Sequence, residues 1–289
     1  MKIINTLDMI QDIFSNGSFD LKNWRIYIEK ILPSYSDLFI NDMNNMINTG
    51  KYHFKKDFLP ILNLVHSHER DVNRVVSLFD FVTQNLEQKI VATFGKSIDV
   101  DIILYLGLCN GAGWAIKIDN KQTILLGIEK IMELQWFDLQ SMYGLIYHEL
   151  GHIYQMQYGI LERNTRNHRE QLLWQLFTEG IAMYFEQILI ENSSFFHQDS
   201  HGWLKWCENH FDEIRHDFTN DLDTMTKENQ RYFGDWVTYK DYSDVGYYLG
   251  AKFIWFLSNQ YELDEIILLD MDDVIKLLNQ FISNPKEKI

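Results

Sequence analysis

Apolar residues in the first third of the chain recur every three or four positions, which is the spacing of one buried face of an α-helix. The most regular stretch is 67–94, and Gly95 stands where a helix of that length would end. A second helix is expected over 21–32, with Asp20 as its N-cap residue. Residues 1–95 are therefore predicted to form an N-terminal helical region.

The pattern becomes that of β-strands within residues 98–130. The run 100–108 is continuously apolar and too short for a core helix, so it predicts a buried strand. Two further apolar runs, 114–118 and 123–128, are separated by the polar segment 119–122, which is typical of a β-hairpin. Because the sequence has no second strand-rich region, we expect one small sheet.

Helical spacing returns after this region and continues to the end of the chain. The predicted helices are 138–158, 168–191, 202–216, 245–260 and 270–283. The polar segment 217–231 is expected to be an exposed loop. The fold class predicted from these patterns is mainly α with a small β-sheet, an α+β fold, in which residues 96–289 follow the helical region as one domain.

The charge balance restricts the classes of partner. The chain of 289 residues has 26 Lys and Arg against 41 Asp and Glu, a net charge of −15. Such an acidic protein repels phosphate groups, so nucleic acid and anionic membranes are not expected partners. Cys109 and Cys207 are the only cysteines, and no apolar run is long enough for a membrane span. Without a recognisable signal peptide either, the expected location is the cytoplasm.

The segment 148–152 carries the sharpest chemical motif, HExxH. Its two histidines, His148 and His152, lie one helical turn apart on the same face, so both imidazoles can reach one metal ion. Glu149 lies about 100° further around the helix and can reach a water molecule held there. Two nitrogen ligands, a base and an open position are what a zinc hydrolase requires.

The surrounding residues support a helix at this motif. A short motif also occurs by chance in unrelated sequences, so its context matters. Asp138 is a plausible N-cap and Gly159 a plausible stop for a helix over 138–158. An apolar stripe faces away from the histidines and consists of Met142, Ile146, Leu150 and Ile153. The context therefore favours a metal site over a chance match.

A third protein ligand is expected from the next predicted helix. Metzincins carry a third histidine shortly after HExxH, and this sequence has none at that spacing. Glu179 stands in a strongly apolar helix, where a lone carboxylate is costly unless it is paired or metal-bound. The 26 residues between His152 and Glu179 allow the chain to turn back. The alternative is that Glu179 is an ordinary carboxylate on a helix surface.

Three segments resemble known metallopeptidases. HELGH at 148–152 followed by TEGIAMYFE at 178–186 resembles the gluzincins, and the chain looks closest to a bacterial family of predicted zinc-dependent proteases of unknown substrate. The block GYYLG at 246–250 matches a downstream segment of that family. The resemblance implies a zincin-like catalytic domain over 96–289 with one Zn²⁺ per chain. It also implies that His148, His152 and Glu179 are the zinc ligands and that Glu149 is the general base.

The sequence departs from the thermolysin pattern at Met183. Thermolysin-type enzymes have an aspartate at this position, four residues after the ligand glutamate, to support the first histidine. That support must therefore come from elsewhere. Glu186 falls on the same helix face as Glu179 and is either such a partner or a solvated carboxylate. The histidines at 197, 201, 210 and 216 have no ligand spacing and are expected in surface or capping roles.

The resemblance also implies a substrate-binding strand and an oxyanion donor. In gluzincins the edge strand of the small sheet pairs with the substrate backbone, and 110–114 with the strand that follows is its counterpart by order along the chain. Gluzincin aminopeptidases supply a tyrosine from downstream of the ligand glutamate, which points to Tyr247 or Tyr248, with a slight preference for Tyr248. The alternatives are an ordinary glycine-rich connection and two packing aromatics.

The function predicted from these features is hydrolysis of peptide bonds by a zinc metallopeptidase that acts on a peptide or protein substrate. One alternative is a zincin-fold protein that binds or regulates without catalysis, although an intact Glu149 argues against it. Another is a zinc hydrolase for a non-peptide amide or ester. The sequence does not specify the cleavage preference or the oligomeric state.

Overall fold

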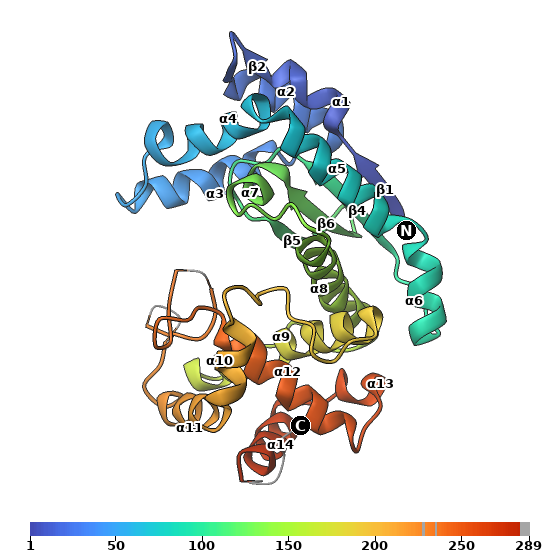
Figure 1. The fold of residues 1–289 in the computed structure, drawn as a ribbon, viewed down its shortest axis with the longest axis vertical. Helices are drawn as coiled ribbons and strands as arrows, with labels where there is room; N and C mark the ends of the chain where they lie inside the picture. Colours follow the sequence, from blue (N-terminus) through green and yellow to red (C-terminus); the bar gives the residue numbers. More distant parts are fainter. Residues whose placement is uncertain (227–228, 235, 284–289) are drawn as a thin grey trace. The chain divides into compact units, whose positions relative to one another are not determined.

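The computed structural model describes residues 1–226, 229–234 and 236–283 (Figure 1). Its internal contacts divide the chain into two compact units, Met1–Ile146 and Tyr147–Ile289. This division does not coincide with the predicted boundary after residue 95. The reason lies in the first unit, where the predicted sheet includes a strand from the very start of the chain.

The sheet of the first unit has four strands in the order β1-β4-β6-β5. Strand β4 (Val100–Tyr105) pairs in parallel with β6 (Lys121–Gly127), which forms an antiparallel hairpin with β5 (Gly113–Ile118). The predicted buried strand and hairpin are thus confirmed, and β5 lies at one edge. The other edge is β1 (Lys2–Asn5), parallel to β4.

The prediction that residues 1–95 are helical is wrong at β1 and at a two-stranded sheet of β2 (Phe14–Ser15) and β3 (Ser18–Phe19). These strands are too short to show a period of two. Strand β1 also owes its conformation to pairing with β4, almost a hundred residues further along the chain. Local pattern carries no information about such a partner.

The remaining elements of the first unit are helices. They are α1 (Leu7–Ile10), α2 (Leu21–Ile31), α3 (Ser36–Asn48), α4 (Leu59–Ser67), α5 (Glu69–Thr83), α6 (Leu86–Phe94) and α7 (Ile128–Glu133), with a 3-10 turn at Gln11–Ile13 and a π turn at Phe54–Phe58. Asp20 caps α2 as predicted, since its side chain accepts from two backbone N–H groups. The single helix predicted over 67–94 is divided because Asn85 adopts a left-handed conformation with φ 57°.

A carboxylate is enclosed where β4 ends and α7 begins. Glu129 is 0% exposed, and its two oxygens accept from the N–H groups of Gly107 at 2.8 Å and Cys109 at 3.0 Å. Burial raises the pKa of Glu129 to about 7, and these hydrogen bonds only partly oppose the rise. Glu129 therefore holds its proton more tightly in the folded chain than in the unfolded chain.

This shift predicts a pH-dependent stability. Since the pKa is 4.5 in the unfolded reference and about 7 when folded, the unfolding free energy should fall as pH rises between these values, by about 3 kcal/mol. Glu129→Gln mimics the neutral acid and should flatten the dependence. Denaturant unfolding at about pH 5 and about pH 8 measures both slopes. Glu69→Gln, at an exposed site, serves as control, and equal slopes in Glu129→Gln and wild type would contradict the prediction.

Helix α8 (Leu139–Tyr158) leads from the first unit into the second, whose named elements among the described residues are all helices. Its other helices are α9 (His168–Ile190), α10 (Trp203–Asn209), α11 (Phe211–Asp221), α12 (Val245–Ser258), α13 (Leu263–Ile266) and α14 (Met271–Ser283). The predicted helices are confirmed, except that 202–216 is divided at His210. Asp138 caps the start of α8, where its Oδ1 accepts from the Ser141 N–H at 2.9 Å.

The prediction of an exposed loop over 217–231 is wrong for its first part, because α11 extends to Asp221, and Leu222 and Met225 are buried. Residues 227–228 of that segment lie outside the described residues. As a whole the chain is mainly helical with a small sheet, consistent with the predicted α+β class. Within the described residues no helix has the length and apolar character needed to cross a membrane.

Candidate metal centre

Helices α8 and α9 approach closely at a glycine between the two histidines of the motif. A Cβ atom at Gly151 would lie 2.7 Å from the Cα atom of Ala182, which is too short for any side chain. Only glycine therefore permits this separation of the two helices. The contact places the histidine face of α8 against the face of α9 that carries Glu179.

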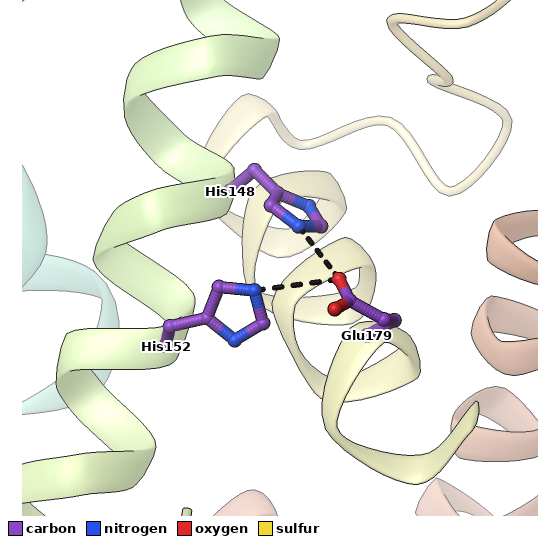
Figure 2. Close-up of side chains that lie close together, drawn as sticks. All are labelled: His148, His152 and Glu179. Carbon is purple, nitrogen blue, oxygen red and sulfur yellow. Dashed lines mark hydrogen bonds and ion pairs between the residues drawn. The ribbon is translucent and has the colours of Figure 1, made fainter. Parts of the chain in front are cut away.

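The side chains of His148, His152 and Glu179 converge, as Figure 2 shows. The Nε2 atom of His148 lies 3.0 Å from Oε2 of Glu179, and the Nε2 atom of His152 lies 3.4 Å from the same oxygen. The two imidazole rings are nearly perpendicular, with an interplanar angle of 87°. Two nitrogen atoms thus face one carboxylate oxygen.

These separations fit a tetrahedral zinc site. Ligand atoms at about 2.0–2.2 Å from zinc lie about 3.3–3.6 Å apart when the geometry is tetrahedral. The observed distances of 3.0 Å and 3.4 Å are close to this range. Two imidazole nitrogens and one carboxylate oxygen also form a common ligand set of catalytic zinc, in which a fourth position stays open. The residues present therefore fit the ion.

The histidines and carboxylates of the centre shift one another's pKa values. Burial alone would lower the pKa of His148, but the carboxylates of Glu179 and Glu186 raise it to about 10. Burial alone would raise the pKa of Glu179, and the neighbouring His152 and His148 hold it well below its usual range. The chain thus places negative charge where two imidazoles gather, which suits a cation.

Glu149 is half-buried and follows His148 directly on α8. Within the described part of the chain, no hydrogen bond or ion pair holds its carboxylate. In this respect it differs from Glu179 and Glu186, both of which contact histidines. An uncommitted carboxylate beside the metal ligands is suited to accept a proton.

The structure separates the two candidate tyrosines on α12. The ring of Tyr247 lies 5.6 Å from the ring of His148, centroid to centroid. Tyr248 points into an aromatic cluster with Phe196 and Trp203, is 3% exposed, and burial raises its pKa. The structure therefore brings Tyr247 to the centre, contrary to the slight sequence preference for Tyr248.

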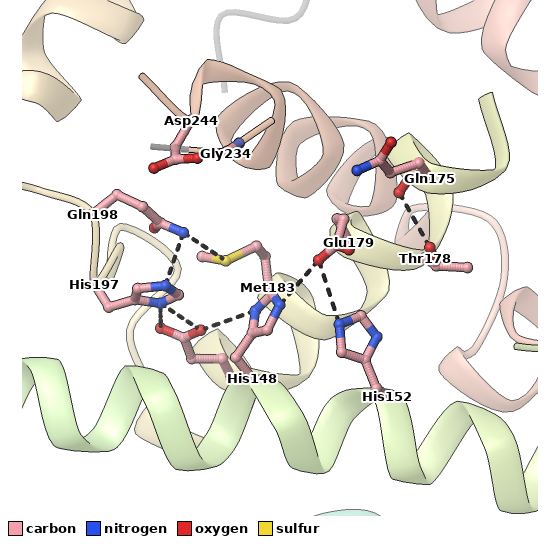
Figure 3. A network of polar contacts seen from close by, with 11 residues as sticks. His148, His152, Gln175, Thr178, Glu179, Met183, His197, Gln198, Gly234 and Asp244 are labelled. Atoms are coloured by element: carbon pink, nitrogen blue, oxygen red, sulfur yellow. Dashed lines mark hydrogen bonds and ion pairs between the residues drawn. The ribbon is translucent and has the colours of Figure 1, made fainter. Parts of the chain in front are cut away.

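The partner of His148 on its other side is Glu186. The Oε2 atom of Glu186 lies 3.7 Å from Nδ1 of His148, and the Glu186 side chain is 0% exposed. The alternative of a solvated carboxylate is therefore wrong. Met183, at the position of the thermolysin aspartate, lies beside Gln198 instead, with 3.8 Å between its Sδ atom and the amide nitrogen (Figure 3).

His197 belongs to the same network, so the expected surface or capping role is wrong for this residue. Its Nδ1 atom lies 3.1 Å from each oxygen of Glu186. Glu186 lies in the last turns of α9, and His197 lies in the segment that follows this helix. No helical spacing therefore links the two residues in the sequence. Only the burial of Glu186 in an apolar helix could have indicated that it needs a partner.

Comparison of the chain with models of protein families, with curated proteins and with solved structures finds no match.

Proposed function

We propose that the chain is a zinc-dependent metallopeptidase with a zincin-like fold of the gluzincin type. The observation that carries the proposal is the convergence of two histidine Nε2 atoms and one carboxylate oxygen between α8 and α9. His148, His152 and Glu179 hold one Zn²⁺ per chain in this proposal. The HExxH motif, the 26-residue interval to Glu179 and the glycine-mediated approach of the helices support it.

The chemistry divides between the ion and the protein. Bound zinc supplies Lewis acidity, which makes a carbonyl group easier to attack and a water molecule easier to deprotonate. Glu149 accepts the proton of the attacking water and passes it to the leaving amine. The hydroxyl group of Tyr247 donates a hydrogen bond to the oxyanion that develops on the attacked carbonyl.

A peptide substrate is supported by two features of the chain. Strand β5 lies at the edge of its sheet, and among the described residues no strand pairs with its outer side, so this backbone edge is of the kind that can pair with an extended peptide. The negative net charge makes nucleic acid a poor substrate. Esters and non-peptide amides are the second class of substrate that the same chemistry could hydrolyse.

Metal content and turnover of the purified protein test the proposal. We expect one zinc per chain, hydrolysis of peptides in a mixed library read by mass spectrometry, loss of hydrolysis on treatment with a chelator, and recovery on addition of zinc. Bound zinc without turnover of any peptide, amide or ester would favour the silent binding protein. Turnover of model amides or esters alone would favour the other hydrolase, and absence of zinc binding would refute the metal centre.

Tyr247→Phe should lower kcat by about 10²–10³-fold with little change in KM, because loss of an oxyanion donor affects the transition state more than substrate binding. Tyr248→Phe should keep a kcat near that of wild type, since its ring packs against Phe196 and Trp203. Steady-state kinetics on zinc-loaded protein measures both. The opposite pattern, with Tyr248→Phe inactive and Tyr247→Phe active, would reverse the assignment.

A further inference from the structure

Glu186 is a fully buried carboxylate between two imidazoles. Its oxygens contact Nδ1 of His197 at 3.1 Å each, and Oε2 lies 3.7 Å from Nδ1 of His148. Among the described residues no lysine or arginine pairs with it. A buried carboxylate without compensating donors is strongly destabilising, so Glu186 depends on these histidines.

The two ring nitrogens of His148 face different carboxylates, Nε2 that of Glu179 and Nδ1 that of Glu186. An ionised carboxylate only accepts hydrogen bonds, so the nitrogen that faces Glu186 is best occupied by a hydrogen. A metal held through Nε2, the atom that faces Glu179, would leave the single hydrogen of the neutral His148 ring on Nδ1, the atom that faces Glu186. The buried Nδ1 has no hydrogen-bond partner in the described part of the chain, and Glu186 is the acceptor within reach.

His197 holds the Glu186 carboxylate in this position. Because one N–H group contacts both oxygens, rotation of the carboxylate would break the contact. The other edge of the His197 ring faces the side-chain amide of Gln198, whose nitrogen lies 2.9 Å from Nε2. The His197 side chain is 13% exposed, and its ring lies 5.6 Å from that of His148. Figure 3 shows these contacts as one network.

We propose that His197 is a positioning residue of the metal centre, which fixes Glu186 and through it the ring orientation of His148. This inference rests on the proposed function, since it concerns a ligand of the zinc ion. Partners of this kind typically change metal affinity about 10-fold to 100-fold when they are removed. His197 reaches the centre from the segment after α9, outside the two motifs that supply the ligands.

The test compares two substitutions at this position. His197→Phe keeps a planar ring and removes the donor to Glu186. His197→Asn keeps an amide N–H close to the place of Nδ1 and should retain most of the effect. His216→Phe, at an exposed histidine of α11, is the matched control. Zinc affinity is measured by competition with a chromophoric chelator, and thermal unfolding of the metal-free proteins checks the fold.

We expect zinc to bind about 10-fold to 100-fold more weakly to His197→Phe, with His197→Asn and His216→Phe close to wild type. If His197→Phe does not fold, Gln198→Leu should give a smaller loss in the same direction.

Three results would overturn the inference, and they are distinguishable. Unchanged zinc affinity in folded His197→Phe would leave His197 as packing while the metal centre stands. Two zinc ions per wild-type chain and one in His197→Phe would make His148, Glu186 and His197 a second ligand set, since their atoms also lie within 4.8 Å of one another. Absence of zinc binding by wild type would remove the proposed function together with the inference.

Discussion

Glu149→Gln is expected to lower kcat by about 10²–10⁴-fold while zinc remains bound with wild-type affinity. The substitution keeps the size of the side chain and removes its ability to accept a proton. Glu149 is half-buried and makes no ion pair among the described residues, so little structural change should accompany it. Steady-state kinetics, zinc titration and thermal unfolding of the two proteins measure the three quantities.

A matched control is Glu208→Gln, at an exposed glutamate of α10. It makes the same chemical change outside the centre and should retain wild-type kcat. If Glu149→Gln turned over as fast as this control, another group would have to accept the proton. If it lost zinc as well as turnover, Glu149 would contribute to metal binding, and the division of roles proposed for the motif would be wrong.

Glu179→Ala is expected to abolish stoichiometric zinc binding, because it removes the carboxylate oxygen that both Nε2 atoms face. Stability gives a second measure of the same effect. Zinc at about 100 times its Kd should raise the unfolding free energy of wild type by about 2.7 kcal/mol, and the variant should gain almost nothing. Thermal unfolding with and without zinc reports the difference.

The apo proteins provide the control for this second prediction. Removal of Glu179 leaves His148 and His152 without their shared acceptor, so metal-free Glu179→Ala should also be less stable than metal-free wild type. Glu208→Ala should keep both zinc binding and stability. Full zinc occupancy in folded Glu179→Ala would show that the third ligand lies elsewhere.

The parts of the centre that the sequence predicted are those that depend on a single helix. The spacing of His148 and His152 determines their common face wherever α8 forms, and the apolar context of Glu179 indicated a paired carboxylate. The Asp20 and Asp138 caps are equally local, and the structure confirms both. In the histidine pair and in the two caps the residues are separated by about one helical turn or less, so local spacing contains the relevant geometry.

The parts that the sequence did not predict depend on distant packing. Which of Tyr247 and Tyr248 faces His148 depends on the rotation of α12 about its axis. That rotation is determined by the packing of α12 against neighbouring segments. The pair of Glu186 and His197 meets around the end of α9, and strand β1 forms through pairing with β4. The division of 67–94 rests on a left-handed Asn85, a conformation that asparagine allows but does not require.

Helix α9 is fixed from two sides by contacts that only glycine allows. Gly151 of α8 lies against Ala182, and a Cβ atom at Gly180 would be 2.5 Å from the carbonyl oxygen of Gly250 on α12. The helices that carry the ligands are thus locked together by backbone packing, independently of the ion. Zinc fingers fold only as they bind metal, whereas the candidate centre described here is held together by backbone contacts of the chain itself. For the proposed metallopeptidase, we therefore expect the metal-free chain to be folded and zinc binding to be a separate, later step.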